Sequence, residues 1–131
     1  MRRPSPVDAD TDRLTGVIVD AAFEVHRTLG PGLLESAYAA CMRHELMERG
    51  IVFRSEVALP VLYKGEQLDA AFRLDLLVAD RVVVELKAVE EVLPIHVAQL
   101  LTYLKLSGCR VGLLVNFKVT RMTDGIRRLV W

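Results

Sequence analysis

The sequence has little cysteine and no long apolar run. Its two cysteines, Cys41 and Cys109, have neither the CxxC nor the Cys/His spacing of zinc ligands, so we expect no zinc site and two buried, reduced thiols. No apolar stretch reaches 18 residues, and the first residues lack the apolar core of a signal peptide. We therefore expect a cytoplasmic protein with no membrane partner.

Net charge is also absent, because 17 Lys and Arg residues balance 17 Asp and Glu residues. The chain therefore lacks the strongly basic composition of a dedicated nucleic-acid-binding domain. The charge is uneven, since residues 105–131 contain six basic residues and a single acidic one, Asp124. In that region Arg121, Arg127 and Arg128 are the candidate contacts to nucleic-acid phosphates, the alternative being an ordinary solvated surface.

Apolar residues are plentiful, at 52% of a chain of 131 residues. A chain of this length and composition can bury a core of its own and corresponds to one domain. Residues 1–10 contain two prolines and no periodicity, so they are predicted to be a flexible arm. Residues 11–131 are predicted to form the single domain.

The spacing of apolar residues predicts an α/β fold. Helices are predicted over 11–29 (with Thr11 or Asp12 as the N-cap), 33–49 and 94–106. Strands are predicted at 51–53 together with 57–63, at 68–78, at 81–88 and at 111–117, with a basic tail after the last. The order α-α-β-β-β-α-β indicates a central mixed sheet flanked by helices, in which Val82–Val84 belongs to a central strand buried on both faces.

Charged residues interrupt two of these apolar strands. Asp75 lies in one, and Glu85 and Lys87 lie on one face of the next. If the two strands are antiparallel, the turn at Ala79-Asp80 brings Asp75 close to Glu85. Two nearby carboxylates with open water positions suit Mg²⁺ or Mn²⁺, and the lysine can prepare a water or stabilise developing charge. The alternative is a salt bridge of a carboxylate with Lys87 or Arg73.

Other polar residues share helical faces. Glu35 and Tyr38 are separated by three positions, and His96, Gln99 and Tyr103 lie at i, i+3 and i+7. Tyr38 can equally be a core aromatic, and Gln99 and Tyr103 a hydrogen-bonded pair between helix and sheet. The three histidines lack HxH or HxxxH spacing, so structural roles are expected for His26 and His96.

Several ordered blocks of the chain resemble one known family. The segment Gly32-Leu-Leu-Glu35-Ser-Ala-Tyr38 resembles the bacterial GxxExxY proteins, which are placed in the PD-(D/E)XK nuclease-like superfamily. The further blocks are Val25-His26-Arg27, Leu59-Pro60-Val61, Arg73–Val78, Val84–Ala88, His96–Tyr103 and Leu113–Phe117. The resemblance runs from about Asp12 to Val130 and implies a restriction-endonuclease-like core.

The resemblance also implies roles for individual residues. Asp75 and Glu85 would ligate the metal and Lys87 would be the catalytic lysine. Glu35 would be the additional acidic residue directed at the metal. Gln99 and Tyr103 resemble the QxxxY element of nucleases related to bacterial recombination exonucleases. Leu74 replaces the proline in the superfamily's name, but that proline is not a ligand.

The expected function is metal-dependent hydrolysis of phosphodiester bonds in nucleic acid, with DNA favoured and Mg²⁺ or Mn²⁺ as the cofactor. Fold does not determine function, so two alternatives stay open. One is a non-catalytic nucleic-acid-binding or scaffold protein on the nuclease fold. The other is a regulatory subunit of a larger assembly. A homodimer would enlarge the small surface that such a domain can offer to a duplex.

Overall fold

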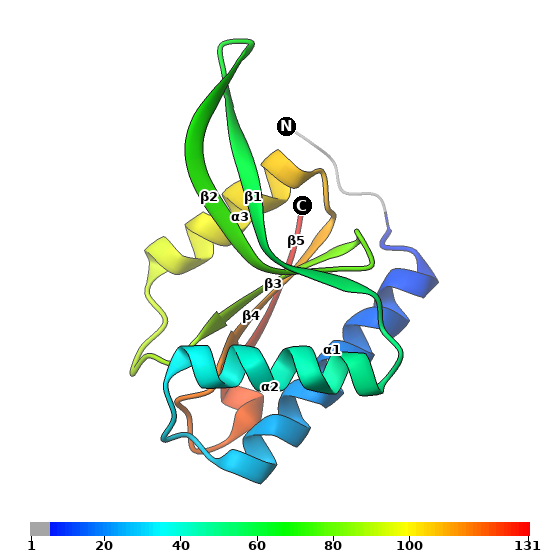
Figure 1. The fold of residues 1–131 in the computed structure, drawn as a ribbon, viewed down its shortest axis with the longest axis vertical. Coiled ribbons are helices and arrows are strands. Elements are labelled where there is room, and N and C mark those ends of the chain that lie inside the picture. The colour runs from blue at the N-terminus through cyan, green and yellow to red at the C-terminus, as the bar shows by residue number, and fades with distance from the viewer. Residues whose placement is uncertain (1–5) are drawn as a thin grey trace.

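The computed structural model describes residues 6–131, apart from the side chains of residues 70 and 71. The helices are α1 (Ala9–Leu29), α2 (Glu35–Glu48), α3 (Pro94–Ser107) and a short 3-10 helix, η1 (Met122–Gly125). The strands are β1 (Phe53–Tyr63), β2 (Glu66–Val78), β3 (Val82–Lys87), β4 (Val111–Asn116) and β5 (Ile126–Val130) (Figure 1). None of the helices in the described part has both the length and the apolarity needed to cross a membrane.

The predicted N-terminal arm only partly falls on described residues, because residues 1–5 lie outside them. Helix α1 already begins at Ala9, and its N-cap is Asp8, whose carboxylate accepts a hydrogen bond from the Thr11 amide at 3.1 Å. The predicted cap at Thr11 or Asp12 is therefore wrong. Asp8 satisfies a free amide of the first turn, and it lies six residues before Leu14, where the apolar periodicity begins.

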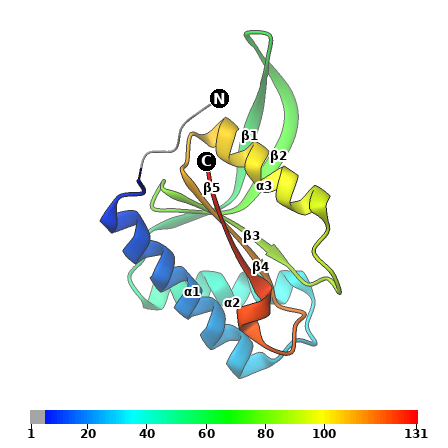
Figure 2. The same cartoon turned by 180° about the vertical axis from the view of Figure 1, so that it is seen from behind.

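The five strands form one mixed sheet in the order β1-β2-β3-β4-β5, with β3 and β4 parallel and all other neighbours antiparallel. Buried residues of α1 and α2 pack on one face of this sheet and those of α3 on the other (Figure 2). The predicted α/β fold is confirmed. Strand β3 is central and its first five residues are buried, as predicted for Val82–Val84.

The predicted basic tail is wrong, because β5 forms there and pairs with β4. A tight turn leads into it: a Cβ atom at Gly125 would lie 2.1 Å from the carbonyl oxygen of Asn116, so only glycine fits. Because Arg127 and Arg128 are adjacent, this edge strand lacks the alternation of apolar and polar residues by which a strand is recognised in a sequence. The two arginines also lie on opposite faces of it, because successive strand residues alternate.

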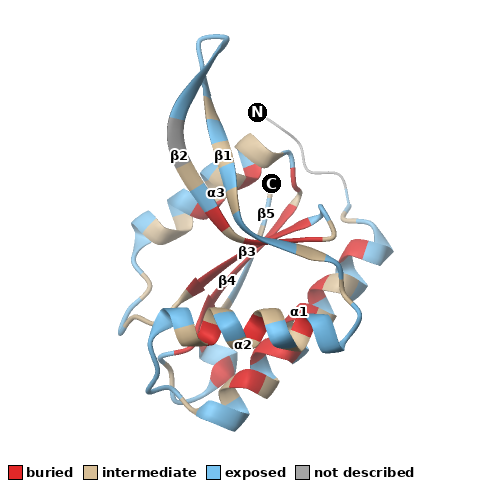
Figure 3. Cartoon of the chain, viewed as in Figure 1, coloured by how far each residue is buried: buried red, intermediate tan, exposed pale blue. Residues whose placement is uncertain are grey.

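Strands β1 and β2 form a long hairpin that projects beyond the rest of the sheet (Figure 1). The predicted segments 51–53 and 57–63 belong to one continuous strand, which begins at Phe53 and includes residues 54–56. β2 pairs with β3 only from Leu76 to Val78, so the outer part of the hairpin leaves the sheet and is largely exposed (Figure 3).

The side-chain alternation of both hairpin strands reverses at Glu56 and Asp75, so that the two faces of the hairpin exchange sides there. Leu76 packs in the core beneath α1 and α2, whereas Leu74, on the same side by simple alternation, packs in the core beneath α3. In β1, Phe53 and Val57 differ in the same way. Glu56 has a φ of 53°, a conformation that L-residues rarely adopt. The exchange therefore turns both strands out of the sheet at one level.

Candidate active site

Asp75 and Glu85 form a crossed pair where β2 separates from β3. The Asp75 amide donates to Oε2 of Glu85, and the Leu86 amide donates to Oδ2 of Asp75, both at 2.8 Å. The backbone ladder ends at Leu76 and Val84, so these amides need other acceptors. The carboxylates supply them, and the predicted approach of Asp75 to Glu85 is present.

Burial makes this pair hard to ionise. Glu85 is 8% exposed, and burial together with the charge of Asp75 raises the pKa of Glu85 to about 8. Burial also raises the pKa of Asp75, although its hydrogen bond from Leu86 and the charge of Lys87 oppose the shift. Without a cation the pair therefore retains a proton near neutral pH. A hard divalent cation would neutralise the two carboxylates in place of that proton.

Lys87 lies beside the pair without forming an ion pair. Within residues 6–131 no salt bridge joins Asp75 or Glu85 to Lys87 or Arg73. The positive charge of Lys87 nevertheless lowers the pKa of both carboxyl groups. The described residues therefore do not contain the alternative, a structural salt bridge. The ammonium group of Lys87 is left to interact with a substrate or a water.

Glu35 faces the pair from the first turn of α2. Burial and the charge of Asp75 raise the pKa of Glu35, while Lys87 and His96 lower it. A cleft of about 310 Å³ lies between them, lined by Glu35, Ser36, Ala39, Glu56, Asp75 and Leu86. Three carboxylates therefore share one cleft, with Lys87 close by.

Glu56 is a member of this cleft that sequence reasoning missed. It stands between the pairs Ser55–Leu76 and Val57–Leu74, across from Asp75. Its charge raises the pKa of Asp75. Unlike Asp75, Glu56 follows two polar residues, Arg54 and Ser55, so it does not stand out in the sequence as a charge within an apolar stretch, and nothing local to it identifies its partner.

Tyr38 belongs to the core and contacts the loop that precedes Glu35. Its side chain is fully buried, and its ring stacks on Phe117 at 4.4 Å between centroids. Its hydroxyl donates to the carbonyl of Gly30 and accepts from the Leu33 amide. Tyr38 thus ties down the loop that leads into α2 and so helps to place Glu35.

Gln99 and Tyr103 lie on α3, on the other face of the sheet. Gln99 is exposed and Tyr103 is half-buried. The Tyr103 ring lies 5.6 Å from that of Phe72. Burial, followed by the charges of Glu85 and Asp75, raises the pKa of Tyr103. The structure therefore brings Tyr103 near the carboxylates, and no hydrogen bond joins it to Gln99 in the described residues.

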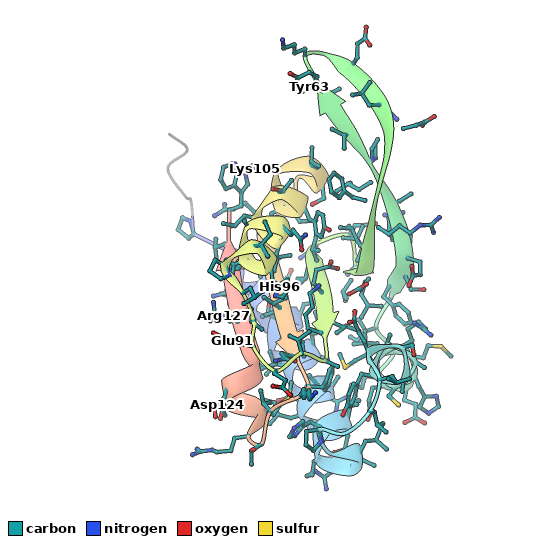
Figure 4. The ribbon with its side chains drawn as sticks, turned by 90° about the vertical axis from the view of Figure 1, so that its left-hand side faces the viewer. Tyr63, Glu91, His96, Lys105, Asp124 and Arg127 are labelled. Atoms are coloured by element: carbon teal, nitrogen blue, oxygen red, sulfur yellow. The ribbon has the colours of Figure 1, made fainter. Side chains whose placement is uncertain are left out.

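Two histidines have structural contacts. His26 Nε2 donates to the carbonyl of Val119 at 2.7 Å and ties α1 to the loop before η1. His96 lies at the start of α3 (Figure 4), and its Nδ1 accepts from the Leu93 amide at 3.0 Å. Residues 6–131 contain no group of three or more His, Cys, Asp and Glu side chains placed to hold a metal. Any metal bound here would therefore rely on water or substrate for part of its coordination.

Two of the three candidate arginines lie on opposite faces of β5. Arg128 pairs with Asp12 on α1 at 2.5 Å, whereas Arg127 lies on the opposite face of β5 (Figure 4). Strand β5 is the sheet edge remote from the hairpin. Arg121 is exposed just before η1. A contact of each with phosphates stays a prediction.

Comparison with known proteins identifies the family at the level of a superfamily. A family model described as the PD-(D/E)XK nuclease superfamily matches residues 12–129. No curated protein and no solved structure gives a match. The matched region includes every strand from β1 to β4 and all the side chains of the cleft described above.

Proposed function

The chain belongs to the PD-(D/E)XK nuclease superfamily, and we propose that it hydrolyses phosphodiester bonds in nucleic acid, with DNA as the favoured substrate. The observation that carries this proposal is the crossed pair of Asp75 and Glu85, with Lys87 beside it. Buried carboxylates that are not neutralised by salt bridges are costly, which favours a functional reason for them.

The donor set fits a divalent cation. Each carboxylate uses one oxygen to hold a backbone amide, which leaves Oδ1 of Asp75 and Oε1 of Glu85 for a metal. Mg²⁺ is commonly held by one or two carboxylates together with water and substrate phosphates, which agrees with the absence of a larger ligand group in the described residues. When bound, the cation supplies charge neutralisation and Lewis acidity at the reacting phosphate.

The remaining residues have separate roles in the proposal. Lys87 orients the attacking water or stabilises negative charge on the phosphate in the transition state. Glu35 adds a carboxylate on the opposite wall of the cleft, where it can direct the cation or an adjacent water. Tyr38 acts through the loop that it anchors and touches no reacting group.

We further propose membership of the GxxExxY group within the superfamily. Its motif residues Gly32, Glu35 and Tyr38 surround the start of α2. Their arrangement supports the assignment, because the glutamate faces the cleft while the tyrosine holds the loop in front of it. The motif thus joins a functional residue to the residue that positions it.

The test is cleavage of labelled single-stranded and double-stranded DNA and RNA by the full chain with Mg²⁺ or Mn²⁺. We expect cleavage that EDTA abolishes and that Lys87→Met reduces by at least about 100-fold, the lower end for a group that transfers protons. Lys105→Met, which removes a lysine at the end of α3, is the matched control and should cleave normally.

Lack of any metal-dependent cleavage, or equal cleavage by Lys87→Met and the wild type, would overturn the catalytic proposal. Isothermal titration with Mn²⁺ adds a second readout. Lys87→Met should keep the affinity for Mn²⁺, whereas Asp75→Asn with Glu85→Gln should lose it. Nucleic-acid binding without cleavage would instead favour the non-catalytic alternative.

A further inference from the structure

A second, smaller cleft lies on the α3 side of the carboxylate pair. Its volume is about 150 Å³, and it is lined by Phe72, Ile95, Ala98, Gln99, Thr102 and Tyr103. The five α3 residues form a stripe at i, i+3, i+4, i+7 and i+8. Leu100 and Leu104 point away from that stripe and are buried against the sheet. Helix α3 therefore has one apolar face for the core and a second face for this cleft.

The exchange of faces in the hairpin creates the cleft. Beyond Asp75, β2 turns toward α3, so that Phe72 lies opposite the helix and its ring meets that of Tyr103 at an angle of 60°. Ala98 is the smallest side chain on the helical wall and leaves the space open. The opening is thus a consequence of β2 leaving β3 at the level of the carboxylates.

Tyr103 joins this cleft to the candidate active site. Its ring forms part of the cleft wall against Phe72, which lies three residues from Asp75 on β2, and the charges of Glu85 and Asp75 contribute to the raised pKa of Tyr103. A nucleic-acid strand with a phosphate at the carboxylates would therefore have an adjacent base beside Tyr103.

We propose that the cleft holds one unpaired nucleobase next to the reacting phosphate, stacked against Phe72 and Tyr103. The inference rests on the proposed nuclease function and specifies its substrate. Aromatic rings bind bases of any sequence by stacking, and the exposed Gln99 amide can donate to and accept from a base edge. A space of about 150 Å³ takes one ring system and not a base pair. A base inside a duplex must first be unstacked and unpaired, so single-stranded or frayed DNA is the preferred substrate.

The experiment measures binding apart from cleavage, in the full chain carrying Lys87→Met and with Mg²⁺ present. The probes are a short single-stranded DNA with 2-aminopurine at successive positions and the matching blunt duplex. We expect quenching of the fluorescent base at one position of the single strand, and tighter binding of the single strand than of the duplex. Phe72→Leu should weaken single-strand binding roughly 5- to 150-fold, the range expected for one stacked base.

Two further variants keep the result interpretable. Ala98→Leu fills the cleft at an exposed helical position, leaves Phe72 and Tyr103 in place, and should lower single-strand affinity without unfolding the protein. Phe23→Leu makes the same aromatic exchange on α1, on the other face of the sheet, and should bind as the parent does. Unchanged affinity and quenching in both Phe72→Leu and Ala98→Leu would overturn the base cleft, even if the wild type cleaves DNA. Absence of binding to either probe would overturn the proposed function as well.

Discussion

The inner and outer parts of the β1–β2 hairpin are made by the same two strands but have different surroundings. The inner part, around Leu76 and Val78, pairs with β3 and is buried beneath α1 and α2. The outer part carries Leu62 and Tyr63, which are 65% and 59% exposed, and α3 is the described helix that lies beside the hairpin (Figure 4). The boundary between them at Asp75 is also where the carboxylates meet. The comparison indicates that the site arises from the separation of two strands.

The largest expected effect is a difference in the free energy of unfolding between variants of the inner and the outer hairpin. Leu76→Ala, in the buried inner part, should lower the free energy of unfolding by about 2–5 kcal/mol, because it leaves a cavity in the core. Leu62→Ala, the same change near the exposed tip, should stay within about 0.5 kcal/mol. Urea unfolding at equilibrium measures both. Equal losses would show that the outer hairpin is as tightly packed as the inner part.

The next effect concerns the boundary and its pH dependence. The pKa of Glu85 rises from 4.5 to about 8 on folding, so the folded protein binds this proton more tightly than the unfolded chain. The resulting stability is complete below about pH 4.5 and is lost as pH rises through about 8. Every tenfold difference in proton affinity between the two states corresponds to about 1.4 kcal/mol. Metal-free wild type should therefore be less stable at pH 9 than at pH 6.

Glu85→Gln provides the control for this pH effect. It removes the titrating group, so its stability should change much less between pH 6 and pH 9 than that of the wild type. Mn²⁺ should stabilise the wild type at pH 9, because a ligand that binds only the folded state favours it, and should stabilise the variant far less. Identical pH profiles for the two proteins would contradict the assignment of the raised pKa to Glu85.

A smaller effect concerns the backbone that exchanges the hairpin faces. Glu56 has a positive φ, which costs an L-residue about 1–2 kcal/mol relative to its usual conformations. Glycine adopts this conformation without that cost, so Glu56→Gly should be more stable than Glu56→Ala by about 1 kcal/mol. Thermal unfolding of the two variants measures the difference. A more stable alanine variant would contradict the left-handed conformation at the boundary.

The smallest effect concerns the sheet edge remote from the hairpin. Arg128 already pairs with Asp12, whereas Arg127 is exposed on the other face of β5. If Arg127 contacts a phosphate, Arg127→Gln should flatten the slope of log affinity for duplex DNA against log salt by about 0.9. Arg128→Gln should change this slope less. Unchanged slopes in both variants would show that β5 does not contact DNA phosphates.

Much of the fold followed from local patterns. The apolar spacing predicted α1, α2 and α3 within a few residues, and the Val82–Val84 run predicted the buried central strand. Strand β5 was not predicted, because its five residues include two adjacent arginines and its pairing partner lies in β4. The cap of α1 was misplaced because Asp8 precedes the periodic residues.

Within the site, Asp75, Glu85 and Lys87 were predictable because charges in apolar strands are costly and require an explanation. Glu56 was not predictable from the hairpin turn. Counting back from the turn at Lys64-Gly65 places Glu56 opposite Arg73, but the register shifts between Leu59 and Val61. That shift moves Glu56 opposite Asp75. Phe72 was likewise absent from the predicted site, because only the exchange of faces turns it toward Tyr103.

The sequence by itself determined the helices, the buried strand β3 and the carboxylates and lysine of the candidate site, since these depend on residue type and on spacing within single elements. The tertiary structure alone decided which side chains meet. The shifted register between Leu59 and Val61, and the exchange of faces that puts Leu76 beneath α1 and α2 but Leu74 beneath α3, are properties of strand pairing and of packing between elements. They place Glu56 beside Asp75 and open the cleft between Phe72 and α3, because a strand that changes its side-chain alternation presents a different face to each helix.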